Sequence, residues 1–313
     1  FIPENRKFLI QPCRLTSSAS ASVAAKPDRN QFMQNPEKGA IRRLFLFLAC
    51  VVPALAVADN DIACPVSQAD ETVRVRYVHD GDTVHLEDGR KIRLIGINTP
   101  ELARDDKPEQ AFAREARQAL NTALALHDNR IGLVYGQERF DRYKRTLAHL
   151  FTPDGNNLQA LLLQQGMALA ITHPPNTRYT ECYVSQERIA RCQRKGLWAR
   201  PDRVITRAAD LGPESSGFQL VSGDIEHFSQ TDKGIRLFMS EVMISIHSRD
   251  LDAFDVAELA SLPGKTVTIR GWLHPANKAS GRQSRYGRTV KFYLRLRHPS
   301  ALEINPAAIE TEC

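Results

Sequence analysis

Three short segments of this chain concentrate carboxylates, amide oxygens and arginines. They are Asp80-Gly81-Asp82-Thr83, the run from Arg93 to Glu101, and Asp141-Arg142-Tyr143-Lys144-Arg145. Hydrolysis of a phosphodiester requires an activated water, neutralisation of the charge that develops on the phosphate, and a cation or proton that assists the leaving oxygen. Hard oxygen ligands, a carboxylate base and guanidinium groups are the side chains suited to that chemistry.

The first two segments offer oxygen donors to a hard cation. Asp82 provides a carboxylate, Asn98 an amide oxygen and Thr99 a backbone carbonyl, and Ca²⁺ prefers ligands of these kinds. Glu101 follows closely enough to face the same pocket, where its carboxylate can act as a general base. This set predicts a metal-assisted hydrolase.

Each segment also has a purely structural interpretation. Asp80-Gly81-Asp82 is typical of a tight turn, and the residue before Pro100 is expected at a strand exit. Arg145 could be one member of a solvated basic surface. Arg93 shares its strand parity with two isoleucines downstream and is therefore expected to point inward, where a guanidinium needs a carboxylate or phosphate partner. The occurrence of all three segments in this order favours the catalytic interpretation.

In order and spacing, the three segments resemble the active site of the staphylococcal (thermonuclease) nuclease family, over residues 72–198. The resemblance implies hydrolysis of DNA and RNA with Ca²⁺ assistance and low base specificity. It assigns roles to six residues: Asp82, Asn98 and Thr99 as calcium ligands, Glu101 as general base, and Arg93 and Arg145 as phosphate-binding groups.

Two positions depart from the family pattern. The family usually has Asp where this chain has Asn98, so one ligand loses its charge and calcium binding is expected to be weaker. The family usually has Gly directly before its second Arg, whereas Lys144 stands here and can add a phosphate contact. The alternative function is therefore a catalytically weak or inactive nucleic-acid-binding protein of the same fold.

The hydrophobic pattern predicts a mainly β fold with helices (α+β). In the first strand, Val73, Val75 and Tyr77 alternate with Arg74 and Arg76, so the first three are expected to face the core. The pattern permits several α+β layouts, and the family resemblance selects the five-stranded OB-fold barrel. Strands are expected at 72–78, 83–86, 91–97, 130–135 and 146–151, and helices at 108–126, 158–165 and 183–195.

A second, smaller β-rich domain is predicted after the nuclease domain at 68–200 and a polar linker at 201–216. Residues 217–305 show five strands with a helix before the fourth, which is OB-like: strands at 218–228, 235–238, 243–247, 267–273 and 292–297, and a helix at 252–259. Its basic stretch predicts contacts with nucleic acid, although a solvated loop explains it equally well. The basic residues assigned to this role, together with Lys144, are Arg282, Arg285, Arg288 and Lys291.

The N-terminal region shows a secretory pattern. Residues 1–32 are polar and aperiodic and are interpreted as a non-native or disordered extension. Residues 33–58 combine a positive region, an apolar stretch and a small-residue cleavage site, so they are interpreted as a signal peptide. We therefore expect a periplasmic or secreted protein, with a membrane-anchored form as the alternative. After signal removal we expect a monomer without stable membrane association. The net charge of +6 favours polyanionic partners such as DNA and RNA.

The cysteines predict one disulfide. Of six cysteines, Cys13 and Cys50 fall in segments expected to be removed. Cys182 and Cys192 flank a predicted helix, about 15 Å apart along its axis, which is beyond disulfide reach. Cys64 precedes the first strand and is free to cross to this helix. A Cys64–Cys182 disulfide is therefore expected.

Overall fold

The computed structural model describes residues 63–66, 68–104, 107–276 and 289–304. The predicted extension (1–32) and signal peptide (33–58) lie outside the described residues, as do Arg282, Arg285 and Arg288. Within the described part of the chain, no helix combines the length and apolar character needed to span a membrane.

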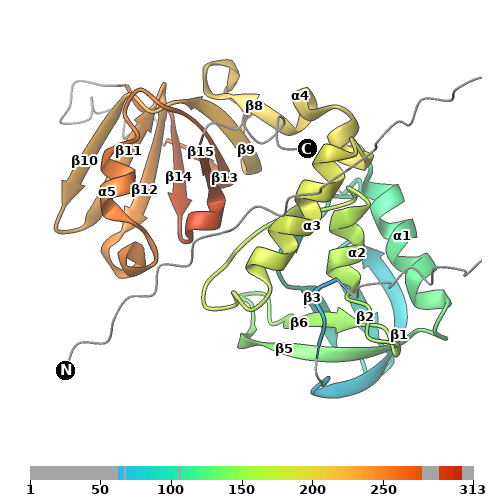
Figure 1. Cartoon of the computed structure of the whole chain (residues 1–313). Helices are drawn as coiled ribbons and strands as arrows, with labels where there is room; N and C mark the ends of the chain where they lie inside the picture. The colour runs from blue at the N-terminus through green and yellow to red at the C-terminus, as the bar shows by residue number, and fades with distance from the viewer. Residues whose placement is uncertain (1–62, 67, 105–106, 277–288, 305–313) are drawn as a thin grey trace, which may run out of the picture. The chain divides into compact units, whose positions relative to one another are not determined.

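The first β structure is a closed five-stranded barrel with strand order β1-β2-β3-β6-β5 (Figure 1). Neighbouring strands are antiparallel except β3 and β6, which run parallel with Ile92 opposite Thr146. Alternating apolar side chains fill the interior, so the predicted OB-fold barrel is confirmed. The strands are β1 (Glu71–Asp80), β2 (Thr83–Leu86), β3 (Lys91–Leu94), β5 (Arg130–Phe140) and β6 (Thr146–Phe151).

The predicted strand at 91–97 is interrupted after Leu94. Gly96 adopts a left-handed φ of 84°, and a Cβ at this position would lie 2.5 Å from the Tyr183 ring. The chain then resumes as β4 (Ile97–Asn98), which pairs with β7 (Leu169–Ala170) in a separate two-stranded sheet. This turn at Gly96 places Asn98 outside the barrel sheet.

The expectation for Arg93 is right about its carboxylate partner, Asp82, and its low exposure of 13%, but wrong about its orientation towards the barrel core. Ile92 and Leu94 are buried in the barrel core, and because side chains alternate along a strand, Arg93 projects from the opposite face. The parity argument failed because the strand ends before the isoleucines with which Arg93 was aligned.

The expected inward orientation of Tyr77 is also wrong, because β1 contains a bulge. Val75 pairs with Leu86 and Tyr77 pairs with His85, so the register shifts by one residue between the two pairs. A bulge of this kind turns the following side chains to the other face. Tyr77 is accordingly 45% exposed, whereas Val78 takes the next core position.

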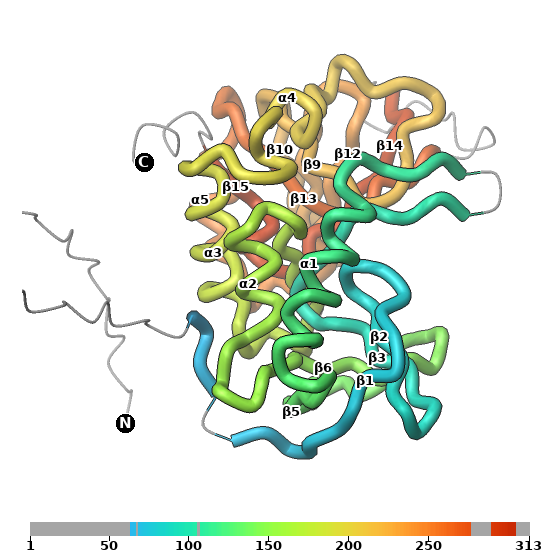
Figure 2. Tube along the Cα trace, turned by 90° about the vertical axis from the view of Figure 1, so that its right-hand side faces the viewer, coloured from blue at the N-terminus to red at the C-terminus, as the bar shows by residue number. Residues whose placement is uncertain are grey.

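Three helices pack against the barrel and one another (Figures 1 and 2): α1 (Ala113–Ala125), α2 (Leu158–Gln164) and α3 (Thr180–Cys192). α1 contacts β1 and α2, and α2 contacts α3 and β6. α1 begins later than the predicted start at Pro108, because Phe112 before it adopts a left-handed φ of 69°. The apolar stripe expected on this helix is buried: Ala113, Ala116, Leu120 and Leu124.

The second β unit repeats the strand order of the barrel. β10 continues the chain after β9 with a break of two residues, so the pair together occupies the place of one long first strand. The sheet order is β10-β11-β12-β14-β13-β9. If β9 and β10 together count as the first strand, then β11, β12, β13 and β14 are the second to fifth, and their order in the sheet is the same as in the barrel. As in the barrel, the third strand (β12) and the fifth (β14) are parallel. The strands are β9 (Gly217–Asp224), β10 (His227–Thr231), β11 (Gly234–Met239), β12 (Val242–His247), β13 (Thr266–Pro275) and β14 (Phe292–Leu296).

The predicted linker at 201–216 contains regular structure. α4 (Pro201–Val204) is followed by β8 (Ile205–Arg207), which pairs in parallel with β9. Ala208 is buried in the core of the second unit. The helix predicted at 252–259 is instead a 3₁₀ turn (Ser248–Ala253) followed by the short α5 (Val256–Ala260), and β15 (Leu302–Ile304) adds a pairing with β13.

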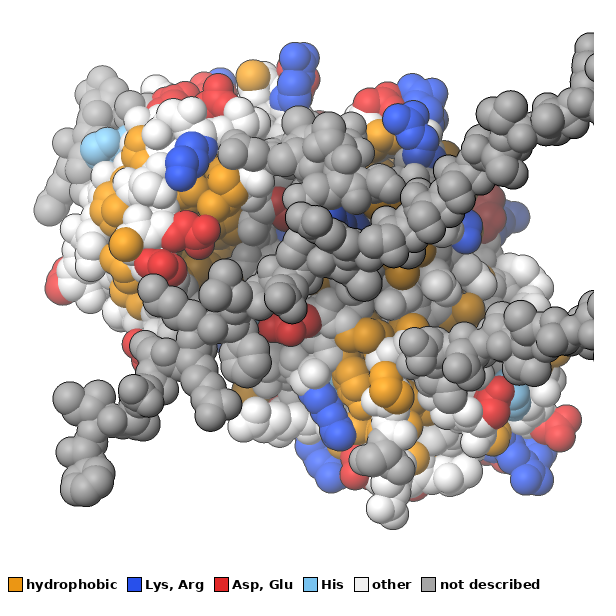
Figure 3. Space-filling model, in the orientation of Figure 1, with side chains coloured by type: hydrophobic (Ala, Val, Ile, Leu, Met, Phe, Trp, Pro, Cys, Tyr) orange, Lys and Arg blue, Asp and Glu red, His pale blue; other side chains and the backbone are white. Residues whose placement is uncertain are grey.

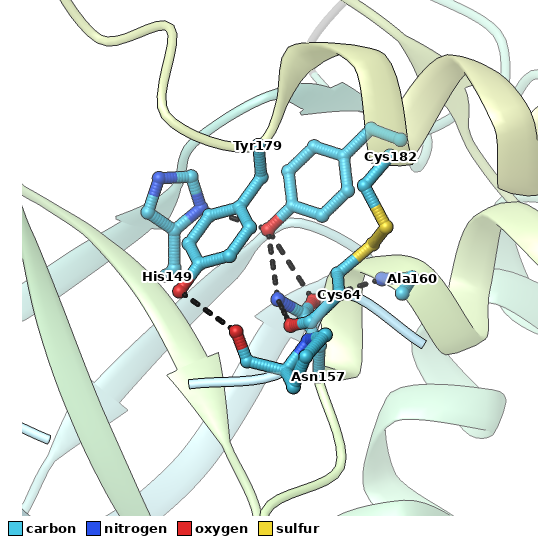
Figure 4. The surroundings of a disulfide bond; sticks show 8 residues. Cys64, His149, Asn157, Ala160, Tyr179 and Cys182 are labelled. Carbon is cyan, nitrogen blue, oxygen red and sulfur yellow. Dashed lines mark hydrogen bonds between the residues drawn. A yellow bond between two sulfur atoms is a disulfide. The ribbon is translucent and has the colours of Figure 1, made fainter. Parts of the chain in front are cut away.

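The predicted disulfide is confirmed (Figure 4). Cys64 and Cys182 are bonded with their Cα atoms 5.7 Å apart, which ties the segment before β1 to α3. Cys192, the last residue of α3, is also disulfide-bonded, and its pairing lies outside the described residues.

Beside this disulfide, His149 is a buried, neutral histidine. Its Nδ1 lies 2.7 Å from the Tyr183 hydroxyl, and the Tyr179 ring meets it edge-on at 4.7 Å. Burial, with a smaller contribution from the charge of Arg178, lowers the pKa of His149 to about 3. The unfolded chain protonates this imidazole near pH 6.5, so the native state loses stability as pH falls from about 6.5 towards 3.

We expect His149→Gln to flatten the acid sensitivity of folding. Because an amide does not titrate, the free energy of unfolding of the variant should fall less steeply than that of the wild type, by up to about 1.4 kcal/mol per pH unit between pH 6 and 4. Urea unfolding at several pH values measures both slopes. Equal slopes would show that His149 is protonated in the native state.

Candidate active site

Asp82 is the centre of the candidate site. It lies in the turn between β1 and β2 and is only 4% exposed. Its Oδ2 accepts hydrogen bonds from the backbone N–H (3.0 Å) and hydroxyl (3.1 Å) of Thr99. Its Oδ1 accepts from the Thr83 hydroxyl at 3.1 Å. Gly81 permits this approach, since a Cβ there would lie 2.8 Å from the Thr99 side chain.

Arg93 is the partly buried partner of this carboxylate. One of its terminal nitrogens lies 3.1 Å from Asp82 Oδ1, and its side chain is 13% exposed. The guanidinium also donates to the carbonyls of Leu94 (2.8 Å) and Ile97 (3.0 Å). It therefore bridges the turn that carries Asp82 and the strand that carries Asn98, with the ion-pair partner that a buried arginine requires.

Asp80 is a second carboxylate that the sequence analysis left without a role. Its Oδ1 accepts a hydrogen bond from the Asp82 backbone N–H at 3.0 Å. Burial and then the negative charge of Asp82 raise the pKa of Asp80 to about 7, and Glu101 adds to the rise, whereas Arg93 opposes it. The spacing of two aspartates around Gly81 was the signal in the sequence. Their mutual repulsion makes the site favourable for a cation.

Glu101 is exposed just beyond β4. Its backbone N–H donates to Gln110 Oε1 at 2.9 Å, and the Gln110 N–H donates to the Glu101 carbonyl at 2.9 Å, so two bonds fix the ends of this loop. After burial and the charge of Asp82, Glu101 makes a smaller contribution to the raised pKa of Asp80, so its carboxylate faces the region of Asp80.

The third segment forms the loop between β5 and β6. Arg145 donates from Nε to Asp141 Oδ2 at 2.7 Å and from its backbone to Asp141 Oδ1 at 2.9 Å. Lys144 is exposed with a left-handed φ of 62°, a conformation that glycine adopts at lower cost. Arg145 directly precedes Thr146, the partner of Ile92, so this loop lies beside the strand that carries Arg93.

The structure brings some of the predicted site residues together and leaves others apart. Asp82 contacts both Thr99 and Arg93, and Asn98 and Glu101 lie on the same segment as Thr99. Among the described interactions, none joins Arg145 or Lys144 to this group. Lys291 belongs to the second β unit, where it pairs with Glu241 at 2.8 Å. No cluster of three or more His, Cys, Asp or Glu residues with metal-binding geometry occurs in the described part of the chain.

On the face shown in Figure 3, the charged side chains over the barrel are of both signs. In the view of Figure 3, basic and acidic side chains are interspersed over the lower part of the molecule, where the barrel strands lie in Figure 1. Local groups at the site, rather than a broad positive surface on this face, would therefore have to hold a phosphate.

Comparison with known proteins finds nucleases among the relatives of this chain. Residues 91–200 match the family model described as "Staphylococcal nuclease homologue". The chain is 31% identical over 163 residues to the thermonuclease of Staphylococcus intermedius, covering 50% of this chain and 95% of that protein. It is 31% identical to the thermonuclease of Staphylococcus hyicus, covering 42% and 77%. It is 33% identical to an uncharacterized endonuclease of Escherichia coli, covering 45% and 85%.

The family-model match begins at β3 and contains the three helices and the second and third segments of the candidate site, whereas the segment that carries Asp82 precedes it. The closed five-stranded barrel agrees with these matches in fold. This chain therefore belongs to the staphylococcal nuclease family.

Proposed function

We propose that this protein is an endonuclease that hydrolyses DNA and RNA phosphodiester bonds with Ca²⁺ assistance and low base specificity. The observation that supports it best is the buried contact of Asp82 with Arg93 and Thr99 beside a second carboxylate, Asp80. A bound cation and an adjacent guanidinium can together neutralise the negative charge on the phosphate oxygens during hydrolysis.

The donors fit Ca²⁺. We assign its ligands as the Asp82 carboxylate, the Asn98 amide oxygen and the Thr99 carbonyl, all hard oxygens. Burial first, and then repulsion from Asp82, raise the pKa of Asp80, and a positive charge beside the pair would relieve that repulsion. When bound, the ion would polarise the phosphate and stabilise the charge that develops on it.

The remaining steps belong to the side chains of the protein. Glu101 accepts a proton from the attacking water. Arg93 and Arg145 bind the non-bridging phosphate oxygens, for which the planar guanidinium offers paired donors. Arg93 is held by Asp82 and two carbonyls, so its position is fixed before substrate binds.

We further propose that the mature protein is an exported monomer. The Cys64–Cys182 disulfide supports an oxidising compartment, either periplasmic or extracellular. In this proposal residues 68–200 form the nuclease domain and residues 217–305 a second domain. Lys144 and Lys291 add phosphate contacts.

One observation favours the alternative, a weak or inactive nucleic-acid-binding protein. Asn98 carries no charge, so Asp82 is the only carboxylate among the three proposed calcium ligands. Ligand charge is a main determinant of Ca²⁺ affinity.

The two functions are separated by an assay of the full chain on DNA and RNA, with calcium and with a chelator. We expect cleavage that requires calcium and falls on the order of 10²- to 10⁴-fold in Glu101→Gln. Glu109→Gln removes a carboxylate of the same loop, one that pairs with Arg114 at 2.9 Å, and should leave cleavage unchanged. A wild type that binds DNA without cleaving it at any calcium concentration would establish the alternative.

A further inference from the structure

An aromatic stack lies on the outer surface of β1 and β2. The bulge in β1 turns Tyr77 outward, opposite His85, and the two rings stack with centroids 4.3 Å apart and planes inclined by 17°. His79 lies beside this pair, with its ring centroid 5.9 Å from that of His85 and its plane tilted by 47°. Tyr77 is 45% exposed. We call Tyr77, His79 and His85 the ring platform.

The barrel register places the ring platform next to the candidate active site. Across β1, β2 and β3, Tyr77 pairs with His85 and His85 with Lys91. These three residues form one row across the sheet. The next row towards the candidate site consists of Asp80, Thr83 and Arg93, in which Asp80 pairs with Thr83 and Thr83 with Arg93. On β3 the two rows are two residues apart, which is about 7 Å.

The two rows also share one face of the sheet. Lys91 and Arg93 have the same strand parity, and the core residue Ile92 lies between them. The platform therefore adjoins the face from which the guanidinium of Arg93 projects.

The charges around the platform are positive. Arg76 and Lys91 are exposed, and the charged groups that act on the His85 imidazole are Lys91, His79 and Arg76. Burial first, and then these cations, lower the pKa of His85, so its ring is neutral at physiological pH. Aromatic rings at the surface with flanking cations suit a nucleobase and the phosphate attached to it.

We propose that the ring platform binds an unstacked nucleobase of the substrate strand, on a nucleotide adjacent to the one whose phosphate lies at Arg93. This inference rests on the proposed nuclease function. Stacking requires a base with a free face, so the platform favours single-stranded over duplex substrate. Every base has such a face, so the platform adds affinity without base specificity.

The test compares the full chain with three variants at position 77 on single-stranded and duplex DNA. Tyr77→Ala should raise KM on single-stranded DNA roughly tenfold at unchanged kcat, because a base–aromatic contact contributes binding in that range. Its KM on duplex should change little. Tyr77→Phe retains the ring and should match the wild type, whereas Tyr77→Leu retains only apolar bulk and should resemble Tyr77→Ala.

Equilibrium binding separates this inference from the proposed nuclease function. The probes are a single-stranded oligothymidylate and an oligomer of equal length without bases, measured with a chelator present. Tyr77→Ala should weaken binding of the first and not of the second, whether or not the wild type cleaves DNA. If a folded Tyr77→Ala variant bound both probes like the wild type, or lost affinity for both equally, the ring platform would not bind a nucleobase. Failure of the wild type to cleave would instead overturn the nuclease function.

Discussion

Replacing Asp82 with alanine is expected to lower turnover by a factor on the order of 10³ or more at any practical calcium concentration. This carboxylate is the only charged group among the three proposed ligands, and it also holds the backbone and hydroxyl of Thr99 and the guanidinium of Arg93. Its removal therefore takes away a ligand and releases two neighbours from their positions. Cleavage assays over a calcium titration measure the loss.

Two further variants separate charge from position in this experiment. Asp82→Asn keeps the shape of the side chain but replaces one accepting oxygen with a donor, so its loss reflects the charge together with one hydrogen-bond acceptor. Asn98→Asp adds a carboxylate and should lower the calcium concentration needed for half-maximal activity. An unchanged calcium requirement in Asn98→Asp would show that position 98 is not a ligand. If a folded Asp82→Ala variant retained full turnover, Asp82 would have no role in catalysis or calcium binding.

The barrel and the disulfide were predictable because their signals are local and redundant. Alternating strands, an Asp-Gly turn and helical apolar spacing each indicate one element, and the resemblance of three ordered segments selected one arrangement. The Cys64–Cys182 disulfide followed from the length of a helix, since ten residues hold Cys182 and Cys192 too far apart to bond. The structure confirms that both cysteines lie on one helix.

The errors arose where one residue changes the phase of a pattern. The β1 bulge inserts a residue, so counting alternate positions assigns Tyr77 to the core although it faces solvent. Gly96 ends the alternation that was used to orient Arg93. The alternation of apolar and polar residues reveals neither the bulge nor the end of the strand. Val, Arg and Tyr all occur in strands whether a bulge is present or not.

The role of Asp80 was missed for a different reason. In sequence it is one of two aspartates around a glycine, and a turn explains both. Its involvement depends on burial and on the distance to Asp82 and Glu101, which only the three-dimensional structure supplies. The segment at 201–216 was misjudged in a similar way, since β8 is polar and short but pairs with β9.

A buried ion-pair network links the second β unit to the candidate site. Arg270 on β13 pairs with Glu187 of α3 at 2.6 Å, and their side chains are 4% and 1% exposed. Arg270 also donates to the Ala170 carbonyl at 3.0 Å, and Glu187 accepts from the Ala170 N–H at 3.1 Å. Ala170 lies on β7, opposite Ile97 of β4. Arg270 thus fixes β7 in place, and β7 in turn pairs with β4, the strand that carries Asn98.

We expect Arg270→Ala to destabilise the fold by about 3–5 kcal/mol, because it leaves the buried Glu187 carboxylate without its ion-pair partner. Urea unfolding measures the loss. Lys291→Ala is the matched control, since it breaks an ion pair of the same unit whose side chains are 59% and 39% exposed, and it should cost less than about 1 kcal/mol.

A double variant separates the buried charge from general packing. Replacing Arg270 and Glu187 together with methionine removes both charges and should recover much of the stability lost in Arg270→Ala, since an apolar pair of similar volume has no charge to desolvate. A loss below about 1 kcal/mol in Arg270→Ala would mean that water reaches Glu187 and that the two β units are only loosely joined. A large loss would mean that residues from 217 onward cannot be removed without disturbing the strand beside Arg93 and Asn98. The second unit would then be a structural requirement of the nuclease site, whatever it contributes to nucleic-acid binding.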